Sequence, residues 1–574
     1  MTTQDENNTL RVKFVAFFFL FLSFILVVRL FQKQILESKN YLVQAKGQQQ
    51  FSKVELAKRG KIFFHDSAED LTKNYAMAYD IKSFSIFVVP KNIVDKHKTA
   101  AKLASFIGKS EMEVYGDINN DKTYLPALKK GLSYEEADKV ETLELTGVYV
   151  LPEYKRYYPE NEFSSQILGF VDAEGNGKYG FEGFYDKELK GSSGKITGEK
   201  DTLGRIISLF SEETPKNGTN YVLSVDRSVN FYMYQALRKA MDDYQAESGL
   251  VVAVDVKSGK IIGMSSLPSF DPNKYQEYAN NKQEELFKNP VIANTYEPGS
   301  IFKPIIVASG LDSGKITPDS GSTFGASVDV QGFTIHTAED KAFGAEKIGD
   351  ILKHSDNVGM VWVGQQIGSP TINDYLKKFG FSEKTGIDLS GENIGIIQQL
   401  KNWGEIGRST ISFGQGISVT PIQLAMAYAA IANKGVLLKP HIVDKMVTDS
   451  GGLSEVETTE VRRVMSEKTA SDLTQMLIGV VEEGYGKKAG VPGFWVAGKT
   501  GTAQIPNTDS PGYQEGIFIH SFAGFAPAND PKFALLVRLD KPKNAKFAES
   551  SAAPVFGNIA SYLLNYYYRI ASDR

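Results

Sequence analysis

Three short segments of the sequence carry residue types that could act together in acyl transfer. Ser300 and Lys303 are separated by two residues in the stretch "YEPGSIFKP". If a helix begins near the serine, the two side chains lie one turn apart on the same face, where the amine could take the serine's proton. The stretch "KHSDNVGM" adds Ser355 and Asn357, and "GFWVAGKTGTAQ" adds Lys499 to Thr502. A serine activated by a neighbouring amine is the chemistry of a covalent acyl-enzyme.

The last of these stretches also matches the pattern of a phosphate-binding loop, with Gly493 as its first glycine and Gly498-Lys499-Thr500 as its end. That loop needs small residues between the glycines and a helix that starts at the lysine. The intervening residues here are Phe, Trp, Val and Ala, and Gly501 and Pro506 make a poor helix start. The stretch therefore predicts the edge of a β-strand, and we expect no nucleotide site.

Two of the motifs occur a second time in the chain. Ser192 and Lys195 also have the serine–lysine spacing, but they lie in a Gly/Ser turn where no helix would align them. Lys384-Thr385-Gly386 is a second Lys-Thr-Gly segment, but Ile387 follows it where a second threonine would help to bind substrate. We expect both repeats to be structural.

A long apolar segment near the N-terminus, Phe14 to Val28, contains no charged residue. A helix of that length spans roughly 22 Å, short of the ~30 Å hydrocarbon core, but Leu30 and Phe31 extend it and Lys13 and Arg29 can reach the two interfaces. No small-x-small cleavage site follows, which favours an uncleaved anchor over a signal peptide. We expect the short N-terminal tail inside the cell and the long C-terminal part outside.

Length and composition limit the remaining possibilities. At 574 residues the chain predicts two or three domains. A net charge of −4 gives no basic footprint for nucleic acid. The chain has no cysteine, and its six histidines show no metal-ligand spacing. We therefore expect neither a metal nor a cofactor.

The C-terminal half begins and ends with hairpin signals. Val251–Val256 and Ile261–Ser266 flank a Gly-containing turn, and 517–526 and 533–539 flank the stretch "PANDPK". Residues 300 to 490 are largely helical in pattern, as in "TPIQLAMAYAAIANKG", where Gly435 is a natural C-cap. This order predicts an antiparallel sheet closed by its own ends, with a helical subdomain inserted.

The region between the anchor and this sheet reads as several smaller pieces. Residues 32–58 are polar and predict a helix or an extended stalk, and Arg59 to Phe64 opens a strand-rich region. Residues 80–150 alternate strand and helix patterns and predict a small α+β insertion. Residues 169–195 are glycine-rich, which predicts turns and loops, and Ser211 to Asn220 is a turn-rich join that we take as the main domain boundary.

The three segments resemble, in type and in order, the S-x-x-K, S-D-N and K-T-G motifs of the serine penicillin-recognising enzymes. Other stretches are similar to class B penicillin-binding proteins, which are membrane-anchored transpeptidases with a non-catalytic pedestal: "RGKIFF", "GFEGFYDKELKG", "SLPSFDPN" and "ISFGQGISVTPIQLAMAYAAIANKG". One departure is that "RGKIFFHDS" lacks the Asp-Arg-Asn-Gly turn common after R-G-x-I, which leaves the detail of the pedestal open.

The resemblance implies an α+β protein with three parts. These are a cytoplasmic tail and transmembrane helix (1–35), an elongated strand-rich pedestal of the class B, dimerisation-like type (36–215), and a β-lactamase-like transpeptidase domain (216–574). It also implies a single-pass protein of a bacterial cytoplasmic membrane, with its N-terminus inside and its catalytic domain outside.

The resemblance further implies a role for each motif residue. Ser300 attacks the D-Ala-D-Ala bond of a peptidoglycan stem peptide, and Lys303 acts as its base, made neutral by burial and by the charge of Lys499. Ser355 relays a proton to the leaving amine, and Asn357 holds the substrate amide. Lys499, Thr500 and Thr502 bind the terminal carboxylate of the stem peptide, and Gly501 is a further substrate-binding residue. Backbone N–H groups of Ser300 and Thr502 form the oxyanion hole, where one donor is worth roughly 3 kcal/mol. β-Lactams acylate the same serine.

Other functions remain as alternatives. A class A-like β-lactamase needs a glutamate with asparagine four residues later, and no glutamate from Val358 to Gly498 has one. Intact Ser300 and Lys303 argue against a non-catalytic β-lactam receptor or scaffold, although acylation without transfer would keep both. Within class B, "SFGQGISVT" and the length favour the division (septal) type over the elongation type. No transglycosylase pattern is apparent, so we expect a membrane glycosyltransferase and division-complex proteins as partners.

Overall fold

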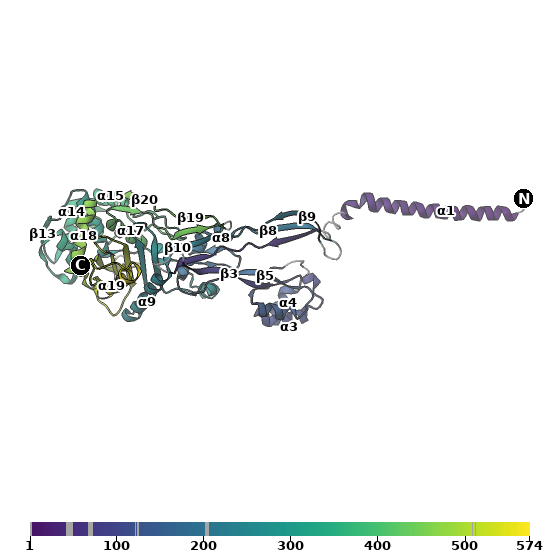
Figure 1. The fold of residues 1–574 in the computed structure, drawn as a ribbon, viewed down its shortest axis with the longest axis horizontal. Helices are drawn as coiled ribbons and strands as arrows, with labels where there is room; N and C mark the ends of the chain where they lie inside the picture. Colours follow the sequence, from purple (N-terminus) through teal and green to yellow (C-terminus); the bar gives the residue numbers. More distant parts are fainter. Residues whose placement is uncertain are drawn as a thin grey trace. The chain divides into compact units, whose positions relative to one another are not determined.

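The computed structural model of the chain describes residues 3–41, 50–66, 73–120, 122, 125–200, 206–448, 451–507, 509–510 and 512–573 (Figure 1). By its internal contacts the chain forms two compact units. The first combines Met1–Ala57 with Gly191–Asn217, and the second combines Lys58–Lys190 with Gly218–Arg574. Each unit is described below by itself.

The first unit contains the apolar helix α1, Thr3–Phe31, which continues as a π-helical turn, η1, Gln32–Leu36. The segment Asn8–Leu36 is long and apolar enough to cross a membrane and includes the predicted span. Its apolar side chains are exposed, as a lipid-facing helix requires.

The unit also contains an antiparallel sheet in the order β1-β8-β9 (Gln50–Glu55, Gly194–Lys200 and Ile206–Glu213). Residues 211–213 thus belong to a strand, and the prediction of a turn-rich join is wrong for them. In the predicted stalk, residues 32–36 are helical and 50–55 are a strand, whereas 42–49 lie outside the described residues.

The second unit begins with a mixed sheet. In the described part of the chain this sheet has the order β19-β18-β10-β2-β3-β4, and β5 pairs with β3. The strands are Ile62–His65 (β2), Asn74–Val88 (β3), Lys129–Leu132 (β4), Val148–Tyr157 (β5), Asn220–Asp226 (β10), Val443–Val447 (β18) and Leu453–Glu455 (β19).

Three helices pack against the far part of β3 and β5 and confirm the predicted α+β insertion. They are α3 (Lys96–Ile107), α4 (Glu111–Ile118) and α5 (Tyr134–Glu141). Ser110 and Ser133 begin the last two with capping boxes, which satisfy the free N–H groups of the first turn. Leu103, Val114 and Ile86 share a small separate core.

The glycine-rich stretch contains more helix than its composition predicts. α7 (Gly180–Phe184) and α8 (Asp186–Lys190) are short helices within it. The side chain of Glu182 in α7 is buried between two arginines, Arg59 and Arg156. Packing around this ion cluster, rather than local propensity, accounts for the helix at this position.

Five strands within the described residues form the sheet that carries the second half of this unit, in the order β12-β11-β23-β22-β21. All neighbouring pairs are antiparallel. The strands are Ser248–Asp255 (β11), Ile261–Leu267 (β12), Ala497–Pro506 (β21), Tyr513–Ala526 (β22) and Phe533–Asp540 (β23). Both predicted hairpins and the closure of the sheet by its two ends are confirmed.

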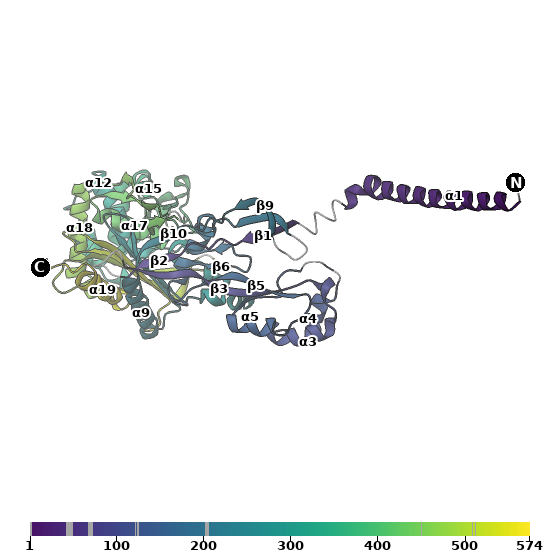
Figure 2. The same cartoon turned by 45° about the vertical axis from the view of Figure 1, so that its right-hand side comes forward.

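Alternate residues of this sheet point to two different cores. Val251 and Ala253 pack with the helices α9 (Arg227–Tyr244) and α19 (Ala552–Tyr562). Leu250 and Val252 belong to the core on the opposite face, which includes α12 and α17 (Lys303–Asp312 and Pro421–Ala432). Figures 1 and 2 show α9 and α19 side by side.

The helix α17 is buried on all sides, as its continuous apolar sequence predicts. Thr420 begins it with a capping box, and Pro421 occupies its first turn. It ends at Ala432, so that Asn433 and not Gly435 is the C-cap. Gly435 has a left-handed backbone (φ +83°) and directs the chain away after the helix has ended.

The inserted helical subdomain contains α13 (Ile348–His354), α14 (Asn357–Ile367), α15 (Ser369–Lys378), α16 (Gly404–Ser412) and α18 (Glu467–Glu482). Two small hairpins precede these helices in sequence. They pair Gly321–Phe324 (β13) with Gly344–Lys347 (β16) and Ser327–Val330 (β14) with Phe333–His336 (β15). The helix α18 packs against both α13 and β21, so this subdomain and the sheet edge are in contact.

Candidate active site

Ser300 lies in a single 3-10 turn, η5 (Gly299–Phe302), immediately before α12. The α-helix itself begins at Lys303, not at Ser300 as predicted, and Pro304 fits its first turn because no N–H is needed there. Gly299 has a left-handed backbone (φ +58°) and donates its N–H to the carbonyl of Gly414 at 2.9 Å. The serine is half-buried, and its hydroxyl has no hydrogen-bond partner among the described residues.

The turn that carries Ser300 packs directly against the strand β21. A Cβ atom added to Gly501 would lie 2.9 Å from the side chain of Ile301 and 3.2 Å from the carbonyl of Pro298. A Cβ atom added to Gly299 would lie 3.0 Å from that of Ala503. Glycine at these positions therefore lets the Ser300 turn approach the 501–503 edge closely.

The amine of Lys303 connects the first two motifs. Its Nζ donates to the carbonyl of Ser355 at 2.6 Å, to the Oγ of Ser355 at 3.2 Å and to the Oδ1 of Asn357 at 2.9 Å. Ser355 follows α13 with a left-handed backbone (φ 56°), which turns its carbonyl and its hydroxyl toward Lys303. Asn357 also donates from Nδ2 to the carbonyl of His336 at 3.1 Å.

Burial makes the Lys303 ammonium lose its proton more easily. The residue is fully buried, and loss of solvation lowers its pKa from 10.5 to about 7. Asp356 and Glu346 oppose this shift with their negative charge. The predicted cause was burial together with the charge of Lys499; burial is the dominant cause found, and the charged groups that act on Lys303 are the two carboxyls.

Lys499 is also fully buried, beneath the edge of the sheet. Burial holds its pKa well below the usual range, and the charge of Lys303 lowers it further. Its Nζ donates to the carbonyl and the Oγ1 of Thr500 at 3.2 and 3.3 Å. Thr502 is half-buried, and its Oγ1 accepts the N–H of Ala548 at 3.1 Å. The three motifs thus meet at one place, between α12, α13–α14 and β21.

The repeated motifs differ from these residues in exposure. Ser192 and Lys195 are exposed, so Lys195 has no burial that could make it neutral. Lys384 is exposed, and Thr385 is engaged by Glu392, which accepts its N–H and its hydroxyl at 2.6 and 2.5 Å. Neither repeat has the buried amine that its counterpart has.

Sequence reasoning missed two residues of the site. Glu346 and Asp356 are buried behind Lys303, and neither was predicted as a site residue. Asp356 was visible only as the middle residue of its motif. Glu346 lies in the strand β16, nine positions before Ser355, and no spacing rule connects it to the motif.

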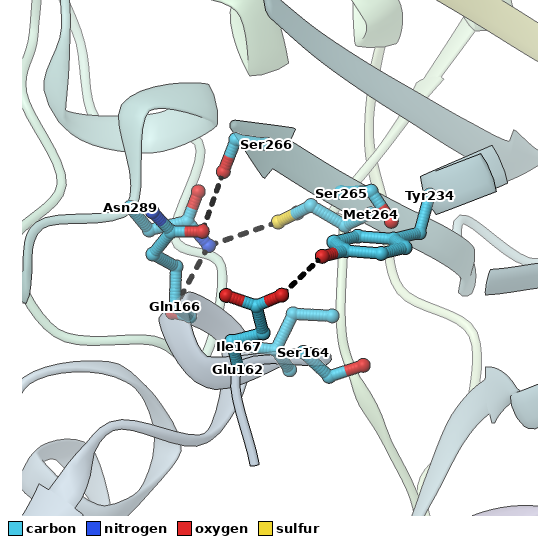
Figure 3. Close-up of a pocket in the computed structure, with 9 residues that line it drawn as sticks. All are labelled: Glu162, Ser164, Gln166, Ile167, Tyr234, Met264, Ser265, Ser266 and Asn289. Atoms are coloured by element: carbon cyan, nitrogen blue, oxygen red, sulfur yellow. Dashed lines mark hydrogen bonds between the residues drawn. The ribbon is translucent and has the colours of Figure 1, made fainter. Parts of the chain in front are cut away.

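A separate pocket lies at the other edge of the sheet, between α6 (Ser165–Leu168), α9 and β12 (Figure 3). Ser266 donates to the Oε1 of Gln166 at 2.8 Å, and the hydroxyl of Tyr234 donates to Glu162 at 2.9 Å. No amine is among its lining residues. These contacts attach the 162–167 segment to the sheet, and the pocket has no lysine that could activate a serine as Lys303 can.

The comparisons with known proteins agree with this site. Residues 249–561 match the family "Penicillin binding protein transpeptidase domain", and residues 54–223 match "Penicillin-binding Protein dimerisation domain". Stage V sporulation protein D of Bacillus subtilis is 35% identical, over 83% of this chain and 74% of that protein. Peptidoglycan D,D-transpeptidase FtsI of Escherichia coli is 32% identical, over 78% of this chain and 73% of that protein.

Solved structures show the same architecture. Penicillin binding protein 3 of Mycobacterium tuberculosis, in complex with aztreonam, superimposes with a TM-score of 0.70 at 25% identity, over 91% of this chain and 98% of that one.

A serine one turn from a fully buried lysine, beside an antiparallel sheet edge and with a second serine on the lysine, defines a serine acyl-transfer enzyme. The chain belongs to the penicillin-binding protein transpeptidase family, and within it to the class B proteins, which combine a dimerisation domain with a transpeptidase domain. It is a peptidoglycan D,D-transpeptidase of the serine acyl-enzyme type that binds β-lactams, and its one apolar N-terminal helix in the described residues fits a membrane anchor.

Proposed function

We propose that Ser300, Lys303 and Ser355 carry out this reaction and that residues Asn357 and 499–502 bind the substrate. The observation that carries the proposal is the state of Lys303: a fully buried amine with a pKa of about 7, held by Ser355 and Asn357 one turn from Ser300. An amine in this state is neutral in an appreciable fraction of molecules at neutral pH and can accept a proton.

In the first half-reaction, the proton of the Ser300 hydroxyl passes to the Nζ of Lys303 as Oγ attacks the carbonyl carbon of the D-Ala-D-Ala bond. The C–N bond then breaks, and a proton delivered through the hydroxyl of Ser355 leaves with the D-alanine amine. In the second half-reaction, an amine of another stem peptide attacks the ester carbonyl, gives up its proton to the same groups and releases Ser300. β-Lactams enter the first half-reaction with their ring amide in place of the peptide bond.

The remaining residues are assigned to binding. The hydroxyls of Thr500 and Thr502 face the carboxylate of the terminal D-alanine, and the buried Lys499 contributes positive charge from beneath the strand. Supporting this, Lys499 lies under the edge and donates to Thr500. Gly501 keeps the strand close to Ser300, and the N–H groups of Ser300 and Thr502 form the oxyanion hole. Asn357 exchanges its contact with the His336 carbonyl for the substrate amide.

The experiment that tests this assignment is covalent labelling of the purified full-length protein, in detergent, with a fluorescent penicillin. We expect Ser300→Ala to lower acylation by on the order of a thousandfold or more, because the acyl group has no other acceptor. Ser192→Ala and Lys384→Met are matched controls in the repeated motifs and should label as the wild type does. Near-normal labelling of Ser300→Ala would refute the assignment, and loss of labelling in either control would show that the wrong repeat had been chosen.

We further propose that the protein crosslinks stem peptides during septal wall synthesis. The similarity of "SFGQGISVT" to the division type and the match to a relative named FtsI support this. A fluorescent fusion should concentrate at the division site and its depletion should block division; a lateral distribution with loss of cell shape would support the elongation type instead. Partners of this role are a membrane glycosyltransferase and division-complex proteins, which crosslinking from α1 and the dimerisation region should capture.

We also propose that the N-terminus lies in the cytoplasm and the catalytic region outside the membrane, because the stem peptides are extracytoplasmic. The chain has no cysteine, so single cysteines at Asn8 and Ser38 report the two sides of the span without background. A membrane-impermeant thiol reagent should label Ser38→Cys and not Asn8→Cys in intact cells; the reverse would contradict this topology. The division into 1–35, 36–215 and 216–574 is proposed on the same footing, supported by the two family matches.

A further inference from the structure

Two buried carboxyl groups lie behind the amine of Lys303. Glu346 lies in the strand β16 and is 3% exposed. Asp356, which follows Ser355, is completely buried. The negative charge of each group, when that group is ionised, acts on Lys303. When an acid and a base are buried close together, it matters which of them is protonated, because each uncompensated buried charge costs several kcal/mol.

One oxygen of each carboxyl group has a partner. The Oε1 of Glu346 contacts the Nδ1 of His354 at 2.5 Å, and the Oδ1 of Asp356 accepts the N–H of Val358 at 2.7 Å, where it caps α14. The other two oxygens, Oε2 of Glu346 and Oδ2 of Asp356, are buried and find no donor among the described residues. A helix cap and a contact with a histidine ring therefore account for only one oxygen of each group.

The two groups complete each other if one of them is protonated. A carboxyl group that keeps its proton donates to a neighbouring carboxylate, which satisfies one buried oxygen on each side. The side chains are in hydrogen-bonding contact, and burial together with this contact raises the pKa of Glu346 to about 8. At neutral pH, Glu346 is therefore the member that holds the proton.

We propose that Glu346 and Asp356 share a single proton beside Lys303, and that Glu346 is by this means a positioning residue for the catalytic amine. The inference rests on the proposed function, since it concerns the same lysine.

The shared proton sets the charge around Lys303. With it, the pair carries one negative charge, which stabilises the ammonium that forms when Ser300 loses its proton. Without it, the pair carries two, and two buried carboxylates in contact repel each other. Because Asp356 caps α14 directly before Asn357, that repulsion acts on the residues that hold the Lys303 amine.

The other charged or titratable groups around the pair are few among the described residues. Asp350, on α13, raises the pKa of Glu346, and Lys303 lowers it. Tyr485 lies within electrostatic reach of Glu346. The side chain of His354 is 43% exposed and stacks on Phe343 with parallel rings 4.7 Å apart. His354 thus gives the buried pair a contact with solvent by which its proton can exchange without passing through the substrate site.

The test is the pH dependence of acylation by a fluorescent penicillin, measured on the full-length protein in detergent from pH 6 to pH 9.5. In Glu346→Gln, a side-chain amide can donate to Asp356 in place of the shared proton, and this amide does not titrate. We expect its acylation rate to be within about threefold of wild type at pH 7. Above pH 8 the wild type loses the shared proton and its acylation rate falls. The ratio of the variant's rate to the wild-type rate should therefore rise about tenfold by pH 9, which is one pH unit above the Glu346 pKa of about 8.

A second variant and a control complete the design. Asp356→Asn presents an amide from the other side of the pair and should flatten the alkaline limb in the same way. Asp350→Asn removes a partly exposed carboxylate that does not share the proton. Because the charge of Asp350 raises the pKa of Glu346, this variant should move the alkaline limb to lower pH without flattening it. Thermal unfolding of each variant at pH 7 establishes that it is folded.

Parallel profiles of wild type and Glu346→Gln in a folded, acylated protein would overturn this inference alone. A rate that falls equally at every pH in Glu346→Gln would also overturn it, since that is the result of a merely structural role. Absence of acylation in the wild type at any pH would overturn the proposed function, and this inference with it.

Discussion

A catalytic lysine has to be neutral before it can take a proton, and in this chain the fold achieves that by removing water from one side chain. Lys303 has no anionic partner within hydrogen-bond distance in the described residues; its three acceptors are a carbonyl, a hydroxyl and an amide oxygen. These neutral acceptors orient the amine. An adjacent carboxylate would instead stabilise its protonated form and raise its pKa.

The pKa of Lys303 predicts an acid limb in the reaction. Below about pH 7 the amine is protonated, so the rate of acylation should fall about tenfold for each unit by which the pH is lowered. The rate should reach its maximum between pH 7 and pH 8, below the alkaline limb expected from Glu346. The check is the acylation rate between pH 5 and pH 8. Lys303→Arg, whose guanidinium stays charged throughout this range, should be inactive at every pH. A wild-type rate that is constant from pH 5.5 to pH 8 would contradict the role of Lys303 as base.

At this scale the sequence predicted the residues better than their environment. The serine–lysine spacing, the second serine and the Lys-Thr-Gly strand identified groups that the fold does bring together. The same letters could not show that Lys499 lies beneath its strand, or that Glu346 adds a charge near Lys303. Both depend on which distant segments the fold brings together around Lys303, and that is a property of tertiary structure.

At the scale of elements, the distance between the Ser300 turn and the strand β21 decides whether both sides of the site can act on one substrate. No side chain separates them, because position 501 is glycine. A methyl group there would lie 2.7 Å from the Oγ of Ser521 and 2.9 Å from Ile301. Since contacts shorter than 3 Å cannot persist, one of the two elements has to move.

Gly501→Ala should therefore impair acylation while leaving the protein folded. We expect the rate to fall by about a hundredfold, the usual effect of a displacement of about 1 Å in an active site. The second-order rate constant with a fluorescent penicillin measures it. Gly349→Ala is the matched control: it lies in α13 of the same domain, its Cβ would meet only Met476 at 3.8 Å, and it should react as the wild type does. An unchanged rate in Gly501→Ala would show that the close approach is not needed.

Elements with a strong periodic pattern were predicted well, and those determined by packing were not. The two hairpins of the five-stranded sheet and the apolar helix α17 carry their signals in adjacent residues. The 3-10 turn at Ser300, the strand end at 211–213 and the short helices α7 and α8 do not. Each of these is only a few residues long, so contacts with distant segments outweigh local propensity.

At the scale of the whole molecule, one buried ion cluster joins segments far apart in the sequence. The two oxygens of Glu182, on α7, accept from the Nε of Arg59 at 2.6 Å and from the Nε of Arg156, on β5, at 2.7 Å. Arg156 also contacts Asp80, on β3, at 3.2 Å. The side chain of Glu182 is completely buried, and those of the two arginines are 7% and 3% exposed. Glu182 is thus the carboxylate that both buried arginines share, and the cluster connects four segments of the dimerisation region.

Glu182→Gln should destabilise the protein far more than so small a change of side chain suggests. The amide fills the same volume but leaves the two buried guanidinium groups with only Asp186 and Asp80 as carboxylate partners. Breaking a buried pair in this way costs about 3–5 kcal/mol. The measurement is the midpoint of thermal unfolding of the full-length protein in detergent. Asp243→Asn removes an exposed partner of Lys239 and should leave the midpoint unchanged. Because Glu182 lies outside the transpeptidase match, Glu182→Gln should still be acylated at low temperature. An unchanged midpoint would mean that the arginines find other acceptors, and that the cluster orients the chain without stabilising it.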